Sequence, residues 1–105
     1  MINKNATIYI VDDDPSVNRS VARLLRSASY QVESFSSAQN FLDLECYERP
    51  CCLILDVSMP GMTGIELQEK LVSLNFKVPI IFITGHATVS MSVHAMKKGA
   101  VNFLE

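Results

Sequence analysis

Short apolar runs alternate with stretches whose apolar residues recur at helical spacing along the whole chain. Five runs read as strands, namely residues 6–11, 30–35, 51–55, 78–83 and 101–104. The runs at 51–55 and 78–83 are almost continuously apolar, which is typical of strands buried on both faces of a parallel sheet. The run at 30–35 instead alternates polar and apolar residues, and this favours a position near a sheet edge.

The first helix is expected directly after the first strand. Asp14 is a good N-cap residue, and Pro15 suits the first helical position because its fixed φ matches a helix. The residues at helical spacing that should form its apolar face are Val17, Val21, Leu24, Leu25 and Ala28.

Three further helices are expected in the remaining gaps. Ser36 and Gln39 have capping-box spacing at the start of a short helix over 36–44, and Thr63 with Glu66 marks a third. The apolar residues assigned to the second and third helices are Phe41, Leu42, Leu44, Ile65, Leu67, Leu71 and Leu74. A fourth helix should end at Gly99.

Five strands alternating with four helices predict an α/β protein with a flavodoxin-like, doubly wound parallel five-stranded sheet. The apolar strands one, three and four should be central and strands two and five at the edges, which gives the order 2-1-3-4-5. A last helix after strand five is missing, so we expect one face of the sheet to lack part of its cover.

Composition narrows the function classes. The 105 residues suit one domain, and 49% apolar residues suffice for a core. With 9 basic against 11 acidic residues, the net charge of −2 argues against nucleic-acid binding by this segment. No apolar run suggests a membrane span or a signal peptide, and the three cysteines, two of them adjacent, read as reduced core residues of a cytoplasmic protein.

Acidic residues follow two strands that should be neighbours in the sheet. Asp12, Asp13 and Asp14 come after the first strand, and Asp56 comes after the third. Carboxyl ends of neighbouring parallel strands meet in one crevice, so these carboxylates should converge. Clustered carboxylates repel each other unless a cation lies among them, and Mg²⁺ is the natural choice. Asp14 is better explained as the helix cap.

A hydroxyl group is expected near the same crevice. Thr84 falls at the carboxyl end of the fourth strand, where its side chain is available to a phosphoryl oxygen. Gly85 follows it and leaves open space beside the acceptor.

These segments together resemble the CheY-like receiver family over the whole chain. The matching pieces are IVDDD at 10–14, LDVSMPGMTG at 55–64 and ITG at 83–85. Within the family, ITGH at 83–86 and AMKKGAV at 95–101 are most similar to FixJ-type receivers, which commonly precede a helix-turn-helix output domain. The resemblance implies a response regulatory domain over 1–105, truncated at its C-terminus and acting in two-component signal transduction and transcription regulation.

The resemblance also implies the roles of the acidic residues. Asp56 would accept a phosphoryl group from a sensor histidine kinase. The chain would then be a phosphoprotein and not an enzyme. The metal ligands would be Asp56, Asp13, Asp12 acting through water, and the backbone carbonyl of Ser58. The cofactor would be Mg²⁺.

The same resemblance implies a switch formed by residues of the fourth and fifth strands. Thr84 would move toward the new phosphoryl group, and Phe103 would occupy the aromatic switch position on strand five. The family carries a lysine just beyond Glu105, so we expect slow phosphorylation of this chain. An exposed apolar sheet face would favour a homodimer or swapped self-association.

Two other functions fit part of the pattern. A haloacid-dehalogenase-like phosphohydrolase also places an Asp-x-Asp motif after a strand, as Asp12 and Asp14 do here, and Thr84 could act as its second-motif hydroxyl. The chain is short for that fold, and the 56–64 loop has no place in it. A flavodoxin-like FMN carrier would need a Ser-, Thr- and Gly-rich loop where this chain has three carboxylates.

Overall fold

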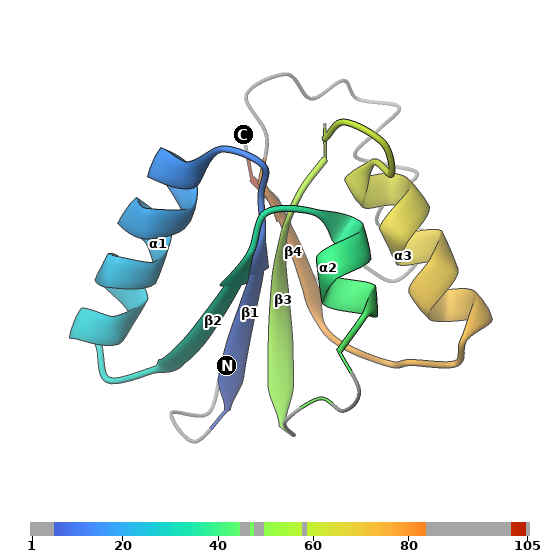
Figure 1. Ribbon diagram of the computed structural model, residues 1–105. Helices are drawn as coiled ribbons and strands as arrows, with labels where there is room; N and C mark the ends of the chain where they lie inside the picture. The colour runs from blue at the N-terminus through green and yellow to red at the C-terminus, as the bar shows by residue number, and fades with distance from the viewer. Residues whose placement is uncertain (1–5, 45–46, 48–49, 58, 84–101, 105) are drawn as a thin grey trace.

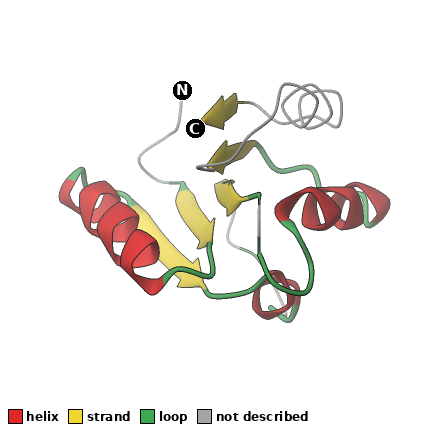
Figure 2. Ribbon diagram, turned by 90° about the horizontal axis from the view of Figure 1, so that it is seen from above, coloured by secondary structure: helices red, strands yellow, loops and turns green. Residues whose placement is uncertain are grey.

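A parallel sheet runs through the molecule with helices on both of its faces (Figures 1 and 2). The computed structural model describes residues 6–44, 47, 50–57, 59–83 and 102–104. The strands are β1 (Thr7–Val11), β2 (Gln31–Phe35), β3 (Cys51–Asp56), β4 (Ile80–Ile83) and β5 (Asn102–Leu104). The described helices are α1 (Pro15–Ser27), α2 (Ala38–Leu42) and α3 (Gly64–Ser73). The predicted fourth helix lies outside the described residues.

The strand order is β2-β1-β3-β4-β5, with all neighbouring pairs parallel, which confirms the predicted flavodoxin-like sheet. The half-polar β2 lies at an edge, and the apolar β3 lies in the middle, as their patterns indicated. Val11 is paired with Leu55, so the residues that follow, Asp12 and Asp56, lie side by side at the carboxyl ends of β1 and β3.

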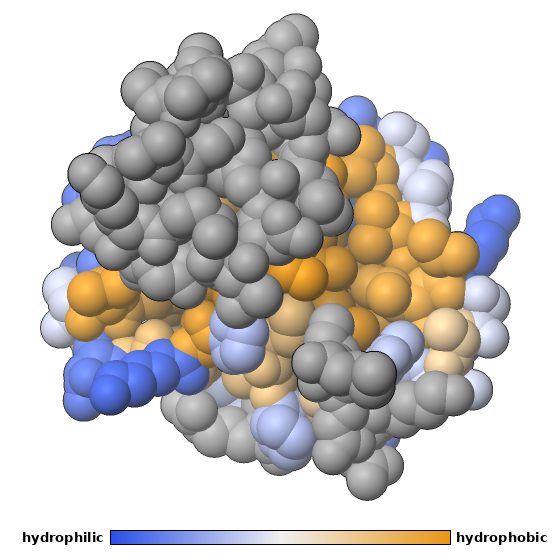
Figure 3. Space-filling view, turned by 180° about the vertical axis from the view of Figure 1, so that it is seen from behind, coloured by the Kyte–Doolittle hydropathy of each residue, from blue (hydrophilic) through white to orange (hydrophobic). Residues whose placement is uncertain are grey.

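Two apolar clusters lie on opposite faces of the sheet, because successive side chains of a strand point to opposite sides. On the face covered by α2 and α3, Leu53 and Leu55 of β3 pack with Leu67 and Leu71 of α3. On the face covered by α1, Ile54 packs in a smaller cluster. Seen from behind, apolar residues form a broad area on the side where α1 lies (Figure 3).

An aromatic cluster fills the larger core between β1 and α2. Its members are Tyr9, Phe35, Phe41, Tyr47 and Phe76. The ring centroids of Tyr47 and Phe76 are 4.6 Å apart, and those of Tyr9 and Phe41 are 5.5 Å apart at a steep angle. The Tyr47 hydroxyl donates to the Phe41 carbonyl at 2.9 Å, so its one polar group ties the end of α2 to the cluster.

Helix starts follow the predicted caps in two cases of three. Asp14 caps α1 with Pro15 at its first position, and Thr63 and Glu66 form the full capping box of α3. The prediction that Ser36 and Gln39 cap the second helix is wrong, because the chain enters the helix one residue later. There Ser37 accepts from the Asn40 N–H at 3.1 Å.

Two leucines assigned to helix core faces are exposed. Leu24 is 70% exposed because the buried stripe of α1 runs through Asn18, Ala22 and Leu25, which leaves Leu24 at its margin. Leu74 is 58% exposed because it is the C-cap residue of α3, beyond the last turn that faces the sheet. Ala28, the C-cap of α1, is exposed for the same reason.

The cysteines and the lengths of the described helices agree with what the composition indicated. Cys51 and Cys52 are buried, reduced cysteines, as predicted for these two residues. Among the described helices, none has the length and apolarity required to cross a membrane.

Candidate functional site

Three carboxylates meet at the carboxyl edge of the sheet. Asp12 follows β1, Asp13 comes next, and Asp56 is the last residue of β3. One carboxylate oxygen from each lies within 4.8 Å of the others. The structure therefore brings together these three of the sequence-predicted site residues, through the parallel pairing of β1 with β3.

The three carboxylates differ in their surroundings. Asp12 is only 6% exposed, Asp56 is half-buried, and Asp13 is exposed. The Asp14 N–H donates to Asp12 Oδ1 at 2.9 Å, which fixes the direction of the buried carboxylate. Burial raises the pKa of Asp12 above its ordinary value against the lowering effect of that N–H, and the charges of Asp13 and Asp14 raise it further.

Asp14 is engaged elsewhere, as its interpretation as a cap requires. Its carboxylate accepts from both the hydroxyl and the N–H of Ser16, at 2.7 and 2.9 Å. These hydrogen bonds lower the pKa of Asp14. The neighbouring residues Asp12 and Asp14 thus have pKa values shifted in opposite directions, one by burial and one by hydrogen bonds at a helix start.

A side chain that the sequence pattern did not single out anchors this loop. The Asn18 side-chain amide donates to the Asp12 carbonyl at 2.6 Å and to the Phe35 carbonyl at 3.3 Å. Asn18 is 9% exposed, on the face of α1 that also buries Ala22 one turn later. A polar residue on the buried stripe of an amphipathic helix is the sequence feature that points to it.

Gly64 lets α3 begin close to the end of β3. Its N–H donates to the Val57 carbonyl at 2.8 Å. A Cβ at this position would lie 2.1 Å from the Asp56 carbonyl oxygen, well inside any real contact. The absence of a side chain at Gly64 therefore sets the path of the chain just after Asp56.

The other predicted site residues are less fully described. Ser58 and Thr84 lie outside the described residues. Phe103 lies in β5, where its backbone is paired with Phe82 of β4.

The three carboxylates fit a Mg²⁺ ion. Mg²⁺ takes oxygen ligands at about 2.1 Å, so two ligands on opposite sides of its octahedron are about 4 Å apart. A set of oxygens within 4.8 Å of one another needs only small side-chain movements to reach that geometry. Burial is the main reason that the pKa of Asp12 is raised, and the charges of Asp13 and Asp14 add to it.

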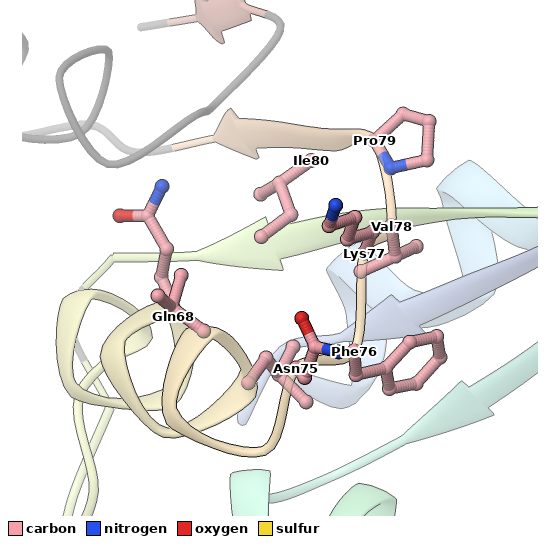
Figure 4. A pocket seen from close by; sticks show the side chains of 9 residues that line it. Gln68, Asn75, Phe76, Lys77, Val78, Pro79 and Ile80 are labelled. Atoms are coloured by element: carbon pink, nitrogen blue, oxygen red, sulfur yellow. The ribbon is translucent and has the colours of Figure 1, made fainter.

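A hollow among the described residues lies away from the carboxylates. A cavity of about 450 Å³ opens between the second half of α3 and the segment leading into β4 (Figure 4). Gln68, Lys77 and Ile80 line it, and its walls are mostly apolar. It lies at the amino end of β4, the opposite edge of the sheet from the carboxylates, and the lining residues include no acidic side chain.

Comparison with known proteins decides the family. The protein-family model of the response regulator receiver domain matches residues 8–105 of this chain. The chain belongs to the response regulator receiver family. Nodulation protein W of Bradyrhizobium diazoefficiens is 46% identical over 99 residues, covering 94% of this chain and 44% of that protein.

Solved receiver structures agree with the fold. A low-resolution structure of the response regulator StyR has a TM-score of 0.87 at 49% identity, covering 95% of this chain and 50% of that chain. The crystal structure of FixJ-N has a TM-score of 0.88 at 41% identity, covering 98% and 82%. The expected similarity to FixJ-type receivers is thereby confirmed.

Membership of the family sets the general function. This receiver is of the kind found in two-component response regulators, where receivers act as phosphoacceptors in signalling and work with histidine kinases. The comparisons lend no support to the alternative of a haloacid-dehalogenase-like phosphohydrolase. The chain spans about half the length of the curated relatives it matches, between 44% and 48% of each.

Proposed function

We propose that Asp56 is the phosphoacceptor of this receiver. One carboxylate oxygen of Asp56 attacks the phosphorus of a kinase phosphohistidine, a P–O bond forms, and the P–N bond to the imidazole breaks. The product is an acyl phosphate on Asp56. The position of Asp56 carries the proposal, because it is the half-buried residue that ends β3 beside Asp12 and Asp13.

We propose that the neighbouring oxygens hold Mg²⁺ during this transfer. Asp12, Asp13 and Asp56 supply carboxylates, and the backbone carbonyl of Ser58 supplies a further oxygen. When bound, Mg²⁺ neutralises negative charge on the phosphoryl oxygens and so lets an anionic acceptor approach them. The Asp14 N–H holds the Asp12 carboxylate through a hydrogen bond and so helps to orient it before the ion binds.

The remaining roles extend the same proposal. Thr84 contacts the transferred phosphoryl group and, with Phe103 on β5, forms the switch that reports phosphorylation. A sensor histidine kinase in the cytoplasm is the donor, and the output is transcriptional. One relative over the matched region is the transcriptional regulatory protein FixJ of Bradyrhizobium diazoefficiens, 44% identical over 98 residues.

We also propose that this chain self-associates through its apolar rear face (Figure 3). The partly buried apolar residues that pack against the smaller cluster, on the α1 side of the sheet, include Val21, Leu25, Ile81 and Ile83. Pairing two such faces would remove this surface from water. Sedimentation velocity over a wide concentration range should show a rising sedimentation coefficient, and a constant monomer value would contradict the proposal. We propose no nucleic-acid binding by this segment.

Phosphorylation is tested by mass spectrometry after incubation with acetyl phosphate and Mg²⁺. The chain should gain the mass of one phosphoryl group, and Asp56→Asn or chelation of Mg²⁺ should abolish the gain. Asp43→Asn is the matched control, because Asp43 is an exposed carboxylate at the end of α2, away from the cluster. Full labelling of the Asp56→Asn variant would overturn the assignment.

A further inference from the structure

The backbone between Asp12 and Asp13 is held by a side chain from α1. The Asn18 amide donates to the Asp12 carbonyl at 2.6 Å. The same amide donates to the Phe35 carbonyl at 3.3 Å, and the Asp12 N–H donates to that carbonyl at 3.1 Å. One amide group therefore joins the ends of β1 and β2 to the second turn of α1.

This contact controls the orientation of two carboxylates at once. The Asp12 carbonyl belongs to the planar peptide group that links Asp12 to Asp13. Rotation of that plane would turn the two side chains relative to each other, because it changes the backbone angles on both sides of the peptide. A hydrogen bond that fixes the plane therefore helps to fix where the Asp12 and Asp13 oxygens lie relative to Asp56.

Helix packing alone does not favour an asparagine at this position. Asn18 occupies the buried stripe of α1 with Ala22, where an apolar residue would pack without a polar group to satisfy. Asparagine is also a weak helix former in a helix interior. Within the part of the chain that the structure describes, the buried Asn18 Oδ1 accepts no hydrogen bond. The position thus tolerates an unfavourable polar atom to keep the amide donor.

We propose that Asn18 is a positioning residue of the acidic site. It acts through the Asp12–Asp13 peptide group and contacts neither the metal nor the phosphoryl group. This inference rests on the proposed function, since it assigns Asn18 to the arrangement of the carboxylates that hold Mg²⁺. Comparable residues that orient metal ligands change metal affinity by about 10- to 100-fold when they are replaced.

The test compares Mg²⁺ affinity with stability in three variants of this chain. Asn18→Ala removes the donor, and Asn18→Leu removes it while keeping the same branched arrangement of side-chain heavy atoms. Ala22→Gly is the control, because it weakens the same face of the same helix one turn away without touching the loop. Mg²⁺ is titrated at a temperature where each variant is folded, with the backbone amide signals of Asp12, Asp13 and Asp14 followed by NMR.

Both Asn18 variants should bind Mg²⁺ about tenfold more weakly, with shifted amide signals at Asp12 and Asp13. Ala22→Gly should lower the melting temperature and leave the Mg²⁺ dissociation constant unchanged. If both Asn18 variants bind Mg²⁺ as the wild-type chain does, Asn18 is merely structural and the inference is overturned. If the wild-type chain neither binds Mg²⁺ nor accepts a phosphoryl group, the proposed function itself fails.

Discussion

Asp12 is the most constrained carboxylate of the cluster. It is nearly buried, it lies beside two other carboxylates, and its N–H, its carbonyl and its Oδ1 each take part in a hydrogen bond. A buried carboxylate that is hard to ionise costs stability in the folded protein, and a bound cation removes much of that cost. The same residue should therefore govern both the pH dependence of stability and its response to Mg²⁺.

Replacing Asp12 by Asn should remove the loss of folding stability that occurs when the buried Asp12 carboxyl group ionises. The pKa of Asp12 is raised from 3.8 in the folded chain, so the folded state binds more protons than the unfolded state just above that pH. The stabilising contribution of Asp12 to the free energy of unfolding is therefore fully present below pH 3.8, and it is lost as the pH rises through the raised pKa of Asp12. In Mg²⁺-free buffer, wild-type stability minus Asp12→Asn stability should fall over this range.

The measurement is urea unfolding at a series of pH values with a chelator present. Taking the difference between the two proteins cancels the opposite contribution of Asp14, whose pKa is lowered. Added Mg²⁺ at ten times its dissociation constant should stabilise the wild-type chain by about 1.4 kcal/mol and Asp12→Asn by less. A difference that rises with pH, or an equal response to Mg²⁺, would contradict this prediction.

At single residues, the sequence predicted local chemistry better than long-range contacts. Asp14 could be assigned as a cap because the cap, Pro15 and the helical pattern are consecutive in the chain. Asp12 and Asp56 could be paired once the strand order was inferred. The hydrogen bonds of Asn18 could not be predicted from the sequence. Its two acceptors, the carbonyls of Asp12 and Phe35, come together only when β1 and β2 pair.

At the scale of elements, the start of α3 connects the acceptor to the rest of the fold. Gly64 lies against the Asp56 backbone, and the Thr63–Glu66 capping box fixes where the helix begins. Any change that moves the start of α3 should also displace the backbone of Asp56. Two substitutions separate the effect of close packing from the effect of capping.

Gly64→Ala should destabilise the chain by about 1–3 kcal/mol, because its Cβ would meet backbone atoms that cannot rotate away. Phosphorylation by acetyl phosphate should slow as well, because the strain falls on the residue that carries the acceptor. Gly61→Ala is the control: Gly61 has φ of 77°, but a Cβ there would meet nothing within 4 Å. It should cost about 1 kcal/mol and leave labelling by the folded chain unchanged. Equal labelling rates for the two variants would argue against the role of Gly64.

Thr63→Ala should cost about 1 kcal/mol, since the Thr63 hydroxyl accepts from the Glu66 N–H at 3.2 Å. Thr63→Ser keeps the hydroxyl and should retain most of the stability. Thermal unfolding followed by circular dichroism distinguishes the two. If Ser is as destabilising as Ala, the capping hydrogen bond is not what matters at this position.

Element boundaries show where sequence patterns lose precision. Ser36 and Ser37 are both able to cap, and only the path of the chain after β2 selects Ser37. Leu24 and Leu74 fit the helical period but lie at the margin and beyond the end of their helices. Spacing along a helix predicts a face, whereas the angle at which that helix crosses the sheet decides how wide the buried face is.

At the scale of the whole molecule, the two faces of the sheet are unequal. The cluster on the α2 and α3 side holds most of the fully buried side chains, and the cluster on the α1 side is smaller. Two adjacent residues of β3 point to opposite faces. Leu53 belongs to the larger cluster and is 0% exposed, whereas Ile54 belongs to the smaller cluster and is 9% exposed. The layer order could be predicted from apolar runs, and an unequal cover of the two faces was expected from the sequence. Which face holds the larger core could not be predicted, because it depends on which helices lie over each face.

Leu53→Ala should therefore cost more than Ile54→Ala, about 4 against about 2 kcal/mol. The closed surroundings of Leu53 would leave a cavity, whereas Ile54 lies where neighbours or water can adjust. Urea unfolding of both variants at the same pH measures the difference. A larger loss for Ile54→Ala would show that the α1 side is the better packed face.

The aromatic cluster has a practical consequence for all of these measurements. The chain has no tryptophan, so its near-ultraviolet optical activity and intrinsic emission come from 3 tyrosines and 5 phenylalanines. Tyr9 and Tyr47 are locked among rings on one side of the sheet, whereas Tyr30 lies on the α1 side. Near-ultraviolet circular dichroism should therefore report the melting of the α2 side. Comparison with the far-ultraviolet backbone signal would show whether the two halves of this receiver unfold together.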